Sequence, residues 1–210
     1  MRAIRFFLLA FFVFAFSPAF AQGGGQAVYD MFVAQLKGGN TSTDYQALRY
    51  AFAETPAYNP YGLGPTSEMM RASNGGDLDQ ALKLAEQILA SNYVDIDAHM
   101  VSFSVYSRRG DMEKAEFHRA VARGLISSIS ASGDGKTPET AFPVISVREE
   151  YIYLLVNDFK VTMQALLQSK NGPVDAMSAV NNKTGRNETV YFDINRLFAG
   201  LAKQFPDQKK

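Results

Sequence analysis

The chain has 210 residues, with 21 basic and 21 acidic side chains, two histidines and no cysteine. A chain of this length can bury a core of its own, and without cysteine it must do so without disulfides. The balanced charge argues against nucleic acid and against an anionic membrane surface as partners, because both select basic patches.

The first 21 residues have the pattern of an export signal. Two early arginines precede an uncharged apolar run over 6–16, and small residues follow at Ala19 and Ala21. As a helix, this run would rise only about 16 Å, well short of a hydrocarbon core of ~30 Å. We therefore expect a cleaved signal peptide over 1–21, a mature chain from Gln22 without membrane insertion, and a periplasmic or secreted bacterial protein.

Apolar residues at helical spacing fill the next part of the chain. Tyr29, Phe32, Val33 and Leu36 form the first such stripe, which Gly38 ends. The expected helices cover residues 29–36, 44–55, 67–72, 78–91, 96–108 and 112–129. Together they predict a helical region over 22–131.

Short segments recur in this region every 34 residues. Gln46-Ala47-Leu48, Gln80-Ala81-Leu82 and Lys114-Ala115-Glu116 begin at this interval, and Gly76-Asp77 returns as Gly110-Asp111. A fixed period of this length is typical of stacked helical hairpins. Such arrays are generally surfaces that hold partners.

The segments GDLDQAL and GDMEKAE resemble the turn and second-helix start of tetratricopeptide repeats. The resemblance implies that Ala81 and Ala115 occupy the small, closely packed position of each unit. Tyr93 and Phe103 depart from the family pattern. We interpret 42–129 as tetratricopeptide-like, with two complete units and one degenerate unit; an ordinary helical bundle is the alternative.

From residue 132 onward, the pattern changes to short alternating segments between turns, which predicts an α+β region over 132–210. Strands are expected over 142–145, 161–167, 174–180 and 189–194, although 163–168 is also compatible with a helix. A short helix follows Ser146, and Asn195 can cap a last one. The expected fold class is α+β, with helical hairpins followed by a small antiparallel sheet.

A second resemblance covers nearly the whole mature chain. Its segments are SGDGKTPETAF over 132–142, VISV over 144–147, EEY over 149–151, ALRY over 47–50 and PAYNPY over 56–61. They are similar to motifs of the bacterial exported proteins grouped as domain of unknown function 4919. This resemblance implies a shared fold and implies no activity.

Familiar catalytic and cofactor motifs lack their usual context. Gly135-Lys136-Thr137 ends like a phosphate-binding loop, but Ser130 stands at the first glycine position. Pro138 follows directly, which favours a tight turn in which Thr137 caps a short helical turn. We therefore expect no catalytic residues and no cofactor.

Two other groups of titratable residues receive structural interpretations. His99 and His118 have no cysteine or carboxylate at metal-ligand spacing, so we expect packed or surface side chains and no metal. Glu149 and Glu150 are adjacent on a helix and point about 100° apart. We expect one to cap the helix and the other to be solvated.

The binding candidates fall into three groups. Arg49 with Tyr58, Asn59 and Tyr61 combines a cation with two tyrosines in a loop. Packing between the degenerate repeat and the sheet is the favoured alternative for these tyrosines. The other candidates are a groove beside Met100, Ser104 and Arg108, and the turn at Asp134.

Two functions remain open from the sequence. The first is a non-enzymatic binding or scaffolding protein of the bacterial envelope, with a protein or peptide partner. The alternative is an enzyme or small-ligand receptor with a pocket between the helical region and the sheet. A shallow groove beside Met100 favours the first, and a deep pocket with perturbed titratable groups favours the second.

Overall fold

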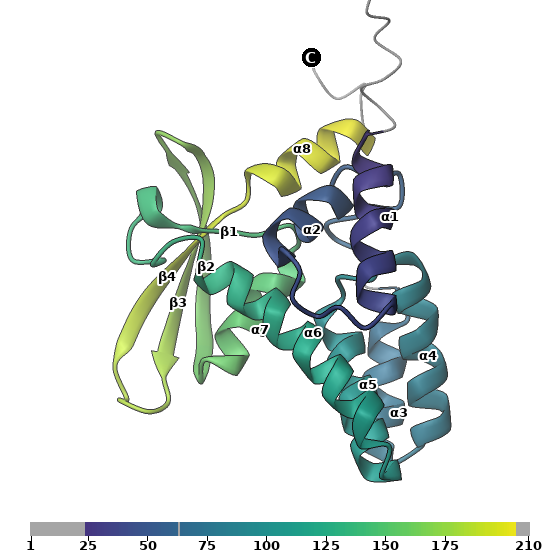
Figure 1. Cartoon of the computed structure of the whole chain (residues 1–210). Helices are drawn as coiled ribbons and strands as arrows, with labels where there is room; N and C mark the ends of the chain where they lie inside the picture. Colours follow the sequence, from purple (N-terminus) through teal and green to yellow (C-terminus); the bar gives the residue numbers. More distant parts are fainter. Residues whose placement is uncertain (1–23, 63, 205–210) are drawn as a thin grey trace, which may run out of the picture.

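The computed structural model describes residues 24–62 and 64–204. Helices lie on one side of the molecule and a four-stranded sheet on the other, with α7 running between them (Figure 1). The helices are α1 (Gly24–Lys37), α2 (Tyr45–Phe52), α3 (Thr66–Gly75), α4 (Leu78–Ser91), α5 (Ile96–Arg109), α6 (Met112–Ser130), α7 (Val147–Val156) and α8 (Asn195–Gln204). The strands are β1 (Phe142–Pro143), β2 (Phe159–Ser169), β3 (Gly172–Asn181) and β4 (Asn187–Asp193).

The expected helices of the first region are present. α4 begins after Asp77, whose side chain accepts a hydrogen bond from the backbone N–H of Gln80. Asp111 caps α6 in the same way through Lys114. A carboxylate at this position satisfies a backbone donor that the helix leaves unpaired, which is why each helix begins there.

Two hairpins, α3–α4 and α5–α6, have closely matching turns. α3 ends at Gly76 with φ of 82°, and α5 ends at Gly110 with φ of 77°. Glycine adopts this left-handed conformation without a steric penalty from a Cβ atom. The first small residues of the second helices, Ala81 and Ala115, are fully buried.

Helix α2 packs against α6 through an unusually close approach. A Cβ atom at Gly124 would lie 2.2 Å from the ring of Tyr45, so only glycine fits at this contact. The Tyr45 hydroxyl donates to the backbone carbonyl of Thr41. The N-terminal helices are thereby tied to the end of the second hairpin.

The sheet has the strand order β1-β4-β3-β2 and is mixed. β2, β3 and β4 form an antiparallel meander, but the two-residue β1 pairs in parallel with β4 through Phe142 and Phe192. The expectation of an antiparallel sheet is therefore wrong for its first strand. α7 and the β2–β3 hairpin intervene between β1 and β4, and they bring the chain back in the same direction.

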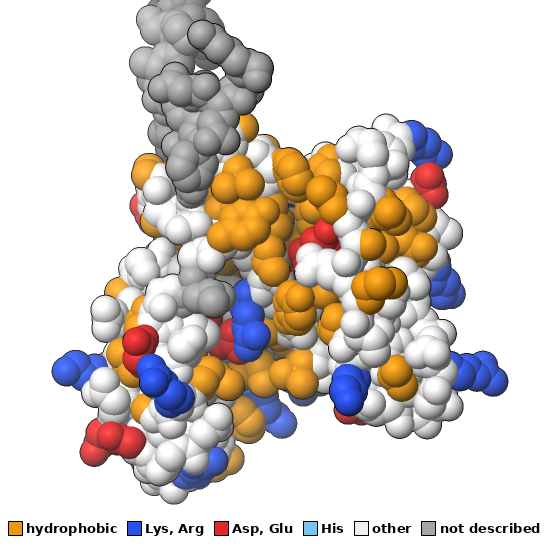
Figure 2. Space-filling view, turned by 180° about the vertical axis from the view of Figure 1, so that it is seen from behind, with side chains coloured by type: hydrophobic (Ala, Val, Ile, Leu, Met, Phe, Trp, Pro, Cys, Tyr) orange, Lys and Arg blue, Asp and Glu red, His pale blue; other side chains and the backbone are white. Residues whose placement is uncertain are grey.

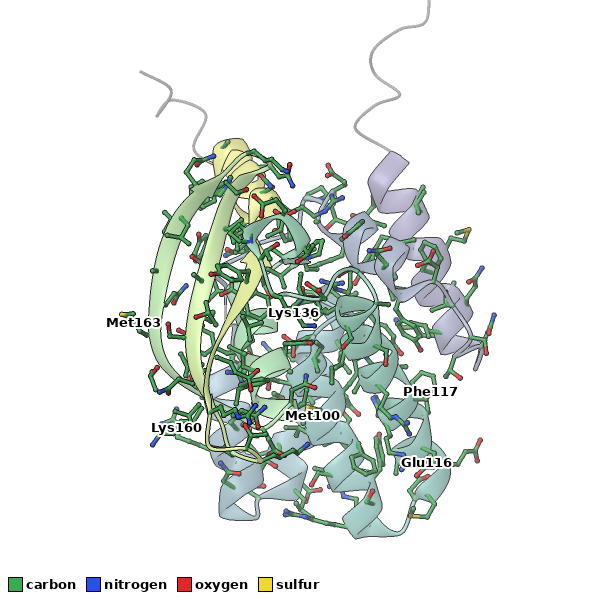
Figure 3. All side chains as sticks on the ribbon, turned by 90° about the vertical axis from the view of Figure 1, so that its left-hand side faces the viewer. Met100, Glu116, Phe117, Lys136, Lys160 and Met163 are labelled. Carbon is green, nitrogen blue, oxygen red and sulfur yellow. The ribbon has the colours of Figure 1, made fainter. Side chains whose placement is uncertain are left out.

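Residues 163–168 belong to strand β2 and not to a helix. β2 forms one edge of the sheet, and no strand within residues 24–62 and 64–204 pairs with its far side. Met163 is 61% exposed and points away from the helices at the outer margin of the sheet (Figure 3).

The segment before β1 is a tight turn, as the sequence predicts. Thr137 and Thr140 form a capping box around a short 3-10 helix that begins at Pro138. Asp134 closes this turn by accepting hydrogen bonds from the Lys136 N–H and the Thr140 hydroxyl. Gly135 has φ of 62° and accepts a backbone hydrogen bond from Tyr191, which fixes the turn against β4.

One buried apolar cluster continues from the helical region into the sheet. It includes Leu48 of α2, Leu125 of α6, Leu154 of α7 and Phe192 of β4, each with no exposed area. Within the described residues, no helix has the length and apolar character needed to cross a membrane.

Candidate functional site

A cavity of about 380 Å³ lies where the helical region meets α7. The loop over 58–62, the start of α5 and the start of α7 surround it. Its apolar walls include Phe52, Val94, Ile96, Ile145, Val147 and Ile152, and its polar lining includes Asn59, Asn92, Asp95, Ser146, Arg148 and Glu149. In Figure 2, hydrophobic side chains gather between the two halves of this face of the molecule, with acidic and basic groups among them.

A buried ion pair stands behind one wall of this cavity. Arg49 Nε lies 2.8 Å from Glu149 Oε1, and Arg49 Nη2 lies 2.6 Å from Glu149 Oε2. The guanidinium also donates to the Pro143 carbonyl and the Ser128 hydroxyl, and Glu149 accepts from the Ile145 N–H. With no exposed area and these partners, Arg49 joins α2, α6, β1 and α7 and does not reach the cavity.

The two tyrosines of the 58–62 loop have different environments. Tyr58 is buried, and its hydroxyl donates to the Ile145 carbonyl at 2.6 Å. Burial, together with the charge of Glu149, raises its pKa. Tyr61 is 49% exposed at the mouth of the cavity, and Asn59 Oδ1 accepts a hydrogen bond from its backbone N–H. Tyr58 therefore connects the loop to the fold, while Tyr61 and Asn59 are placed to contact a ligand.

Asp95 lines the cavity at the start of α5. It caps this helix by accepting from the Ala98 N–H at 2.8 Å, and burial raises the pKa of its carboxyl to about 6. Two residues further on, Asp97 holds the guanidinium of Arg148 in two hydrogen bonds of 2.5 and 2.8 Å. The carboxylate of Asp97 thus neutralises the positive charge of Arg148.

A second acidic group lies beside the cavity, on the side of the sheet. Glu150 of α7 has no exposed area, and neither of its carboxyl oxygens has a hydrogen-bond partner among the described residues. Burial, with the charges of Asp175 and Glu149, raises its pKa to about 9. Asp175 of β3 accepts a hydrogen bond of 2.6 Å from Gln164, which in turn accepts one from the Tyr151 hydroxyl.

The expectation that one of the two adjacent glutamates is solvated is therefore wrong. Because α7 lies between the helical region and the sheet, it is covered on two sides (Figure 1). Glu149 contacts Arg49 of α2, and Glu150 lies near Asp175 of β3. The capping-box spacing after Ser146 identified the helix start, but no local signal distinguishes a buried glutamate from an exposed one.

The remaining sequence candidates lie away from this cavity. Met100, Ser104 and Arg108 lie on α5 and do not line this cavity. Asp134 belongs to the turn before β1, where Lys136 and Thr140 occupy its side chain. The cavity therefore brings together Tyr58, Asn59 and Tyr61, but not the other candidates.

The two histidines contact each other across the α5–α6 hairpin. His99 Nδ1 lies 3.0 Å from His118 Nδ1, and His99 Nε2 lies 3.0 Å from the Tyr93 carbonyl. The carbonyl can only accept, so His99 donates from Nε2 and accepts at Nδ1 from His118. Burial lowers their pKa values to about 3 and 4, so both rings are neutral near pH 7. Within the described ranges, no set of three or more histidine, aspartate or glutamate side chains is placed to hold a metal ion.

Comparison with known proteins gives one match. No curated protein matches the chain, and no solved structure does. A family model described as "Domain of unknown function (DUF4919)" matches residues 37–202, a span that contains the cavity, the buried ion pair and the Glu150–Asp175 pair. With most of its length matched, the chain belongs to the DUF4919 family.

Proposed function

We propose that this chain is a binding protein that holds a small ligand, or one group of a larger ligand, in the cavity between the helical region and α7. The cavity carries this proposal because it combines apolar and aromatic walls with a few polar groups. Its volume of about 380 Å³ lies within the range of known small-molecule sites. Fixed polar groups in a largely apolar pocket orient a ligand, while the walls supply binding energy.

The chemistry of the lining favours binding over catalysis. Glu149 and Arg148 have charged partners within the protein, and no histidine lines the cavity. The neutral His99–His118 pair belongs to the α5–α6 hairpin instead. The serine of the lining, Ser146, caps α7 by accepting from the Glu149 N–H. A histidine beside a serine, as in a nucleophilic pair, is not among the lining residues.

The helical region supports a second candidate, a surface for a protein or peptide partner. The α3–α4 and α5–α6 hairpins have equivalent turns at Gly76 and Gly110, and Ala81 and Ala115 are buried at equivalent positions. These features support a tetratricopeptide-like arrangement, and such arrays commonly hold peptides. Met100, Ser104 and Arg108 on α5 are the residues to substitute in a test of partner binding. Loss of a recovered partner on their substitution, with ligand binding in the cavity intact, favours this candidate.

Export from a bacterial cell remains part of the proposal. Residues 1–21, which carry the expected signal peptide, lie outside the described residues. The intact mass of protein isolated from the periplasm or medium tests this point, with a mature chain that begins at Gln22 as the expected result. Retention of residues 1–21 in that fraction contradicts it.

The cavity itself is tested with a neutral apolar probe. In two-dimensional NMR, n-hexanol should shift the signals of Ile152 and neighbouring lining residues. Val147→Phe adds volume at the lining and should abolish these shifts, whereas Val156→Phe, on the same helix but 39% exposed and outside the lining, should not. No shift in the wild-type protein, or equal shifts in both variants, contradicts the proposal.

A further inference from the structure

The Glu150 side chain is an ionisable group buried inside the protein. The residue has no exposed area, and among the described residues neither Oε1 nor Oε2 has a hydrogen-bond partner. A buried polar group without a partner is costly, and native proteins leave few of them. By contrast, the adjacent Glu149 has Arg49 and the Ile145 N–H as partners. Among the described residues, Glu150 therefore differs from Glu149 in having neither an arginine nor a backbone N–H as a hydrogen-bond partner.

Asp175 provides a second carboxyl at the same place. The residue is 6% exposed, its Oδ2 accepts from Gln164, and its carboxyl interacts with that of Glu150. Burial raises the pKa of Asp175, and its negative charge contributes to the raised pKa of Glu150. Two arginines at this junction, Arg49 and Arg148, are held by Glu149 and Asp97. Two carboxyls without a cation partner thus meet between α7 and β3.

Two tyrosines connect this acidic pair with the cavity. Tyr61 and Tyr151 both line the cavity. The charges of Asp175 and Glu150 add to the effect of burial in raising the pKa of Tyr61. The Tyr151 hydroxyl donates to Gln164, the residue that donates to Asp175. Tyr61 and Tyr151 are 49% and 37% exposed, so both side chains are accessible to a ligand in the cavity that they line.

We propose, on the basis of the binding function above, that the cavity recognises an alkylammonium group, with the ammonium between Glu150 and Asp175 and the alkyl chain along the apolar walls. An ammonium has three N–H donors, and the carboxyls of Glu150 and Asp175 offer it acceptor oxygens once Glu150 has released its proton. The rings of Tyr61 and Tyr151 favour a cation next to their faces. A divalent metal fits less well, because calcium takes six or more oxygen ligands and this place offers two carboxyls and one amide.

The direct test compares two probes that share a hexyl chain and differ in the head group, a charged ammonium in one and a neutral hydroxyl in the other. Calorimetric titration of the full mature chain with n-hexylamine and with n-hexanol near pH 7 should give at least tenfold tighter binding of the amine. Glu150→Gln and Asp175→Asn should each remove this preference and leave hexanol binding unchanged. Glu113→Gln, at an exposed position on α6, is the matched control and should retain the preference.

The outcomes separate this inference from the function on which it rests. If hexanol and hexylamine bind equally, or if the Glu150→Gln and Asp175→Asn variants keep the preference, the ammonium site is wrong and the apolar cavity function stands. If neither probe binds, both proposals fail. The comparison of probes on the wild-type protein requires no variant, so a misfolded variant does not decide it.

A second readout follows the proton of Glu150. Near neutral pH, Glu150 holds a proton when no ligand is bound, because burial raises its pKa to about 9. An ammonium beside it favours the carboxylate, so amine binding should release protons. The observed enthalpy should therefore depend on the ionisation enthalpy of the buffer for the wild-type protein and not for Glu150→Gln. The same slope in both proteins contradicts the assignment to Glu150, since Asp95, Asp175 and Glu149 remain in the variant.

The source of the ammonium is decided by comparing a free amine with a peptide. A blocked tripeptide with a central lysine also presents a primary alkylammonium, carried on a four-carbon side chain. Tighter binding of the tripeptide identifies a lysine side chain of a partner as the ligand, and tighter binding of the free amine identifies a small amine. Acetylation of the lysine should abolish tripeptide binding, and unchanged binding after acetylation contradicts the site.

Discussion

The helical hairpins and the junction around α7 bury different kinds of side chain. At the α3–α4 and α5–α6 hairpins, residues such as Ala81 and Ala115 are buried, while ion pairs such as Lys114–Asp111 lie at the surface. At the junction, ionisable groups lie inside, in the Arg49–Glu149 pair and at the Glu150 carboxyl. Polar groups are expensive to bury, so their concentration at one place needs a specific reason.

Two adjacent glutamates of α7 illustrate two roles that a buried ionisable side chain can have, one in the stability of the fold and one in ligand binding. Glu149 has a complete set of partners, and these partners join α2, β1 and α7. Glu150 has none among the described residues and lies beside a cavity. We infer that the Glu149 carboxylate stabilises the fold and that the Glu150 carboxyl binds a ligand.

The largest expected effect comes from breaking the buried ion pair. Arg49→Met leaves the Glu149 carboxylate buried without its cation, and this should lower the free energy of unfolding by about 3–5 kcal/mol. Urea titration measures the loss. Arg71→Met, at an exposed pair with Glu68, is the control and should change stability by less than about 1 kcal/mol. Equal small losses in both variants contradict a structural role for Arg49.

The helical hairpins should be sensitive to volume instead of charge. Ala81→Leu and Ala115→Leu insert a larger side chain where no area is exposed, and each should cost about 1–3 kcal/mol. Gln80→Leu and Lys114→Leu, at neighbouring exposed positions, should change stability by about 0.5 kcal/mol or less. The same urea titration distinguishes them. Similar small effects at all four positions contradict close packing of the paired helices.

The same contrast explains how far the sequence predicts the molecule. Helix periodicity, aspartate caps and the glycines at 76 and 110 are local signals, so the expected helices of the first region are present with nearly the expected bounds. The turn at Thr137 and Pro138 is local as well. Such signals depend on neighbours along the chain, which the sequence shows directly.

The junction depends on contacts between residues that are distant in the sequence. Arg49 and Glu149 are 100 residues apart, and the parallel pairing of β1 with β4 depends on everything between them. The sequence therefore named Arg49, Tyr58, Asn59 and Tyr61 as candidates, but it could not indicate that Arg49 pairs with Glu149. Glu150 and Asp175 carry no local signal that could have brought them together.

The free energy of unfolding at alkaline pH should depend on the ionisation of the buried Glu150 carboxyl. Burial raises the pKa of Glu150 to about 9, above its value of about 4.5 in an unfolded chain, so the folded state binds more protons between these pH values. The free energy of unfolding should therefore fall as pH rises from 7 to 9, by at most about 1.4 kcal/mol per pH unit. His99 and His118 contribute little there, since their lowered pKa values lie at about 3 and 4.

Glu150→Gln should remove most of this alkaline slope, because glutamine has no proton to lose. Urea titrations at pH 7, 8 and 9 measure the slope for each protein. Glu113→Gln, which is exposed, should retain the wild-type slope. A wild-type slope that persists in Glu150→Gln places the responsible proton on another group.

The smallest effects on stability are expected at the two tyrosines of the cavity loop, and they separate packing from recognition. Tyr58→Phe removes a hydroxyl that donates to the Ile145 carbonyl at 2.6 Å, and this should cost about 0.5–1.5 kcal/mol. Tyr61→Phe removes a hydroxyl from a side chain that is 49% exposed, so stability should change by about 0.5 kcal/mol or less. Binding of n-hexylamine should respond in the opposite order, because Tyr61 is 49% exposed at the cavity, whereas the Tyr58 hydroxyl is held by the Ile145 carbonyl. If Tyr58→Phe weakens binding more than Tyr61→Phe while both proteins unfold at the same urea concentration, the assignment of the two tyrosines is reversed.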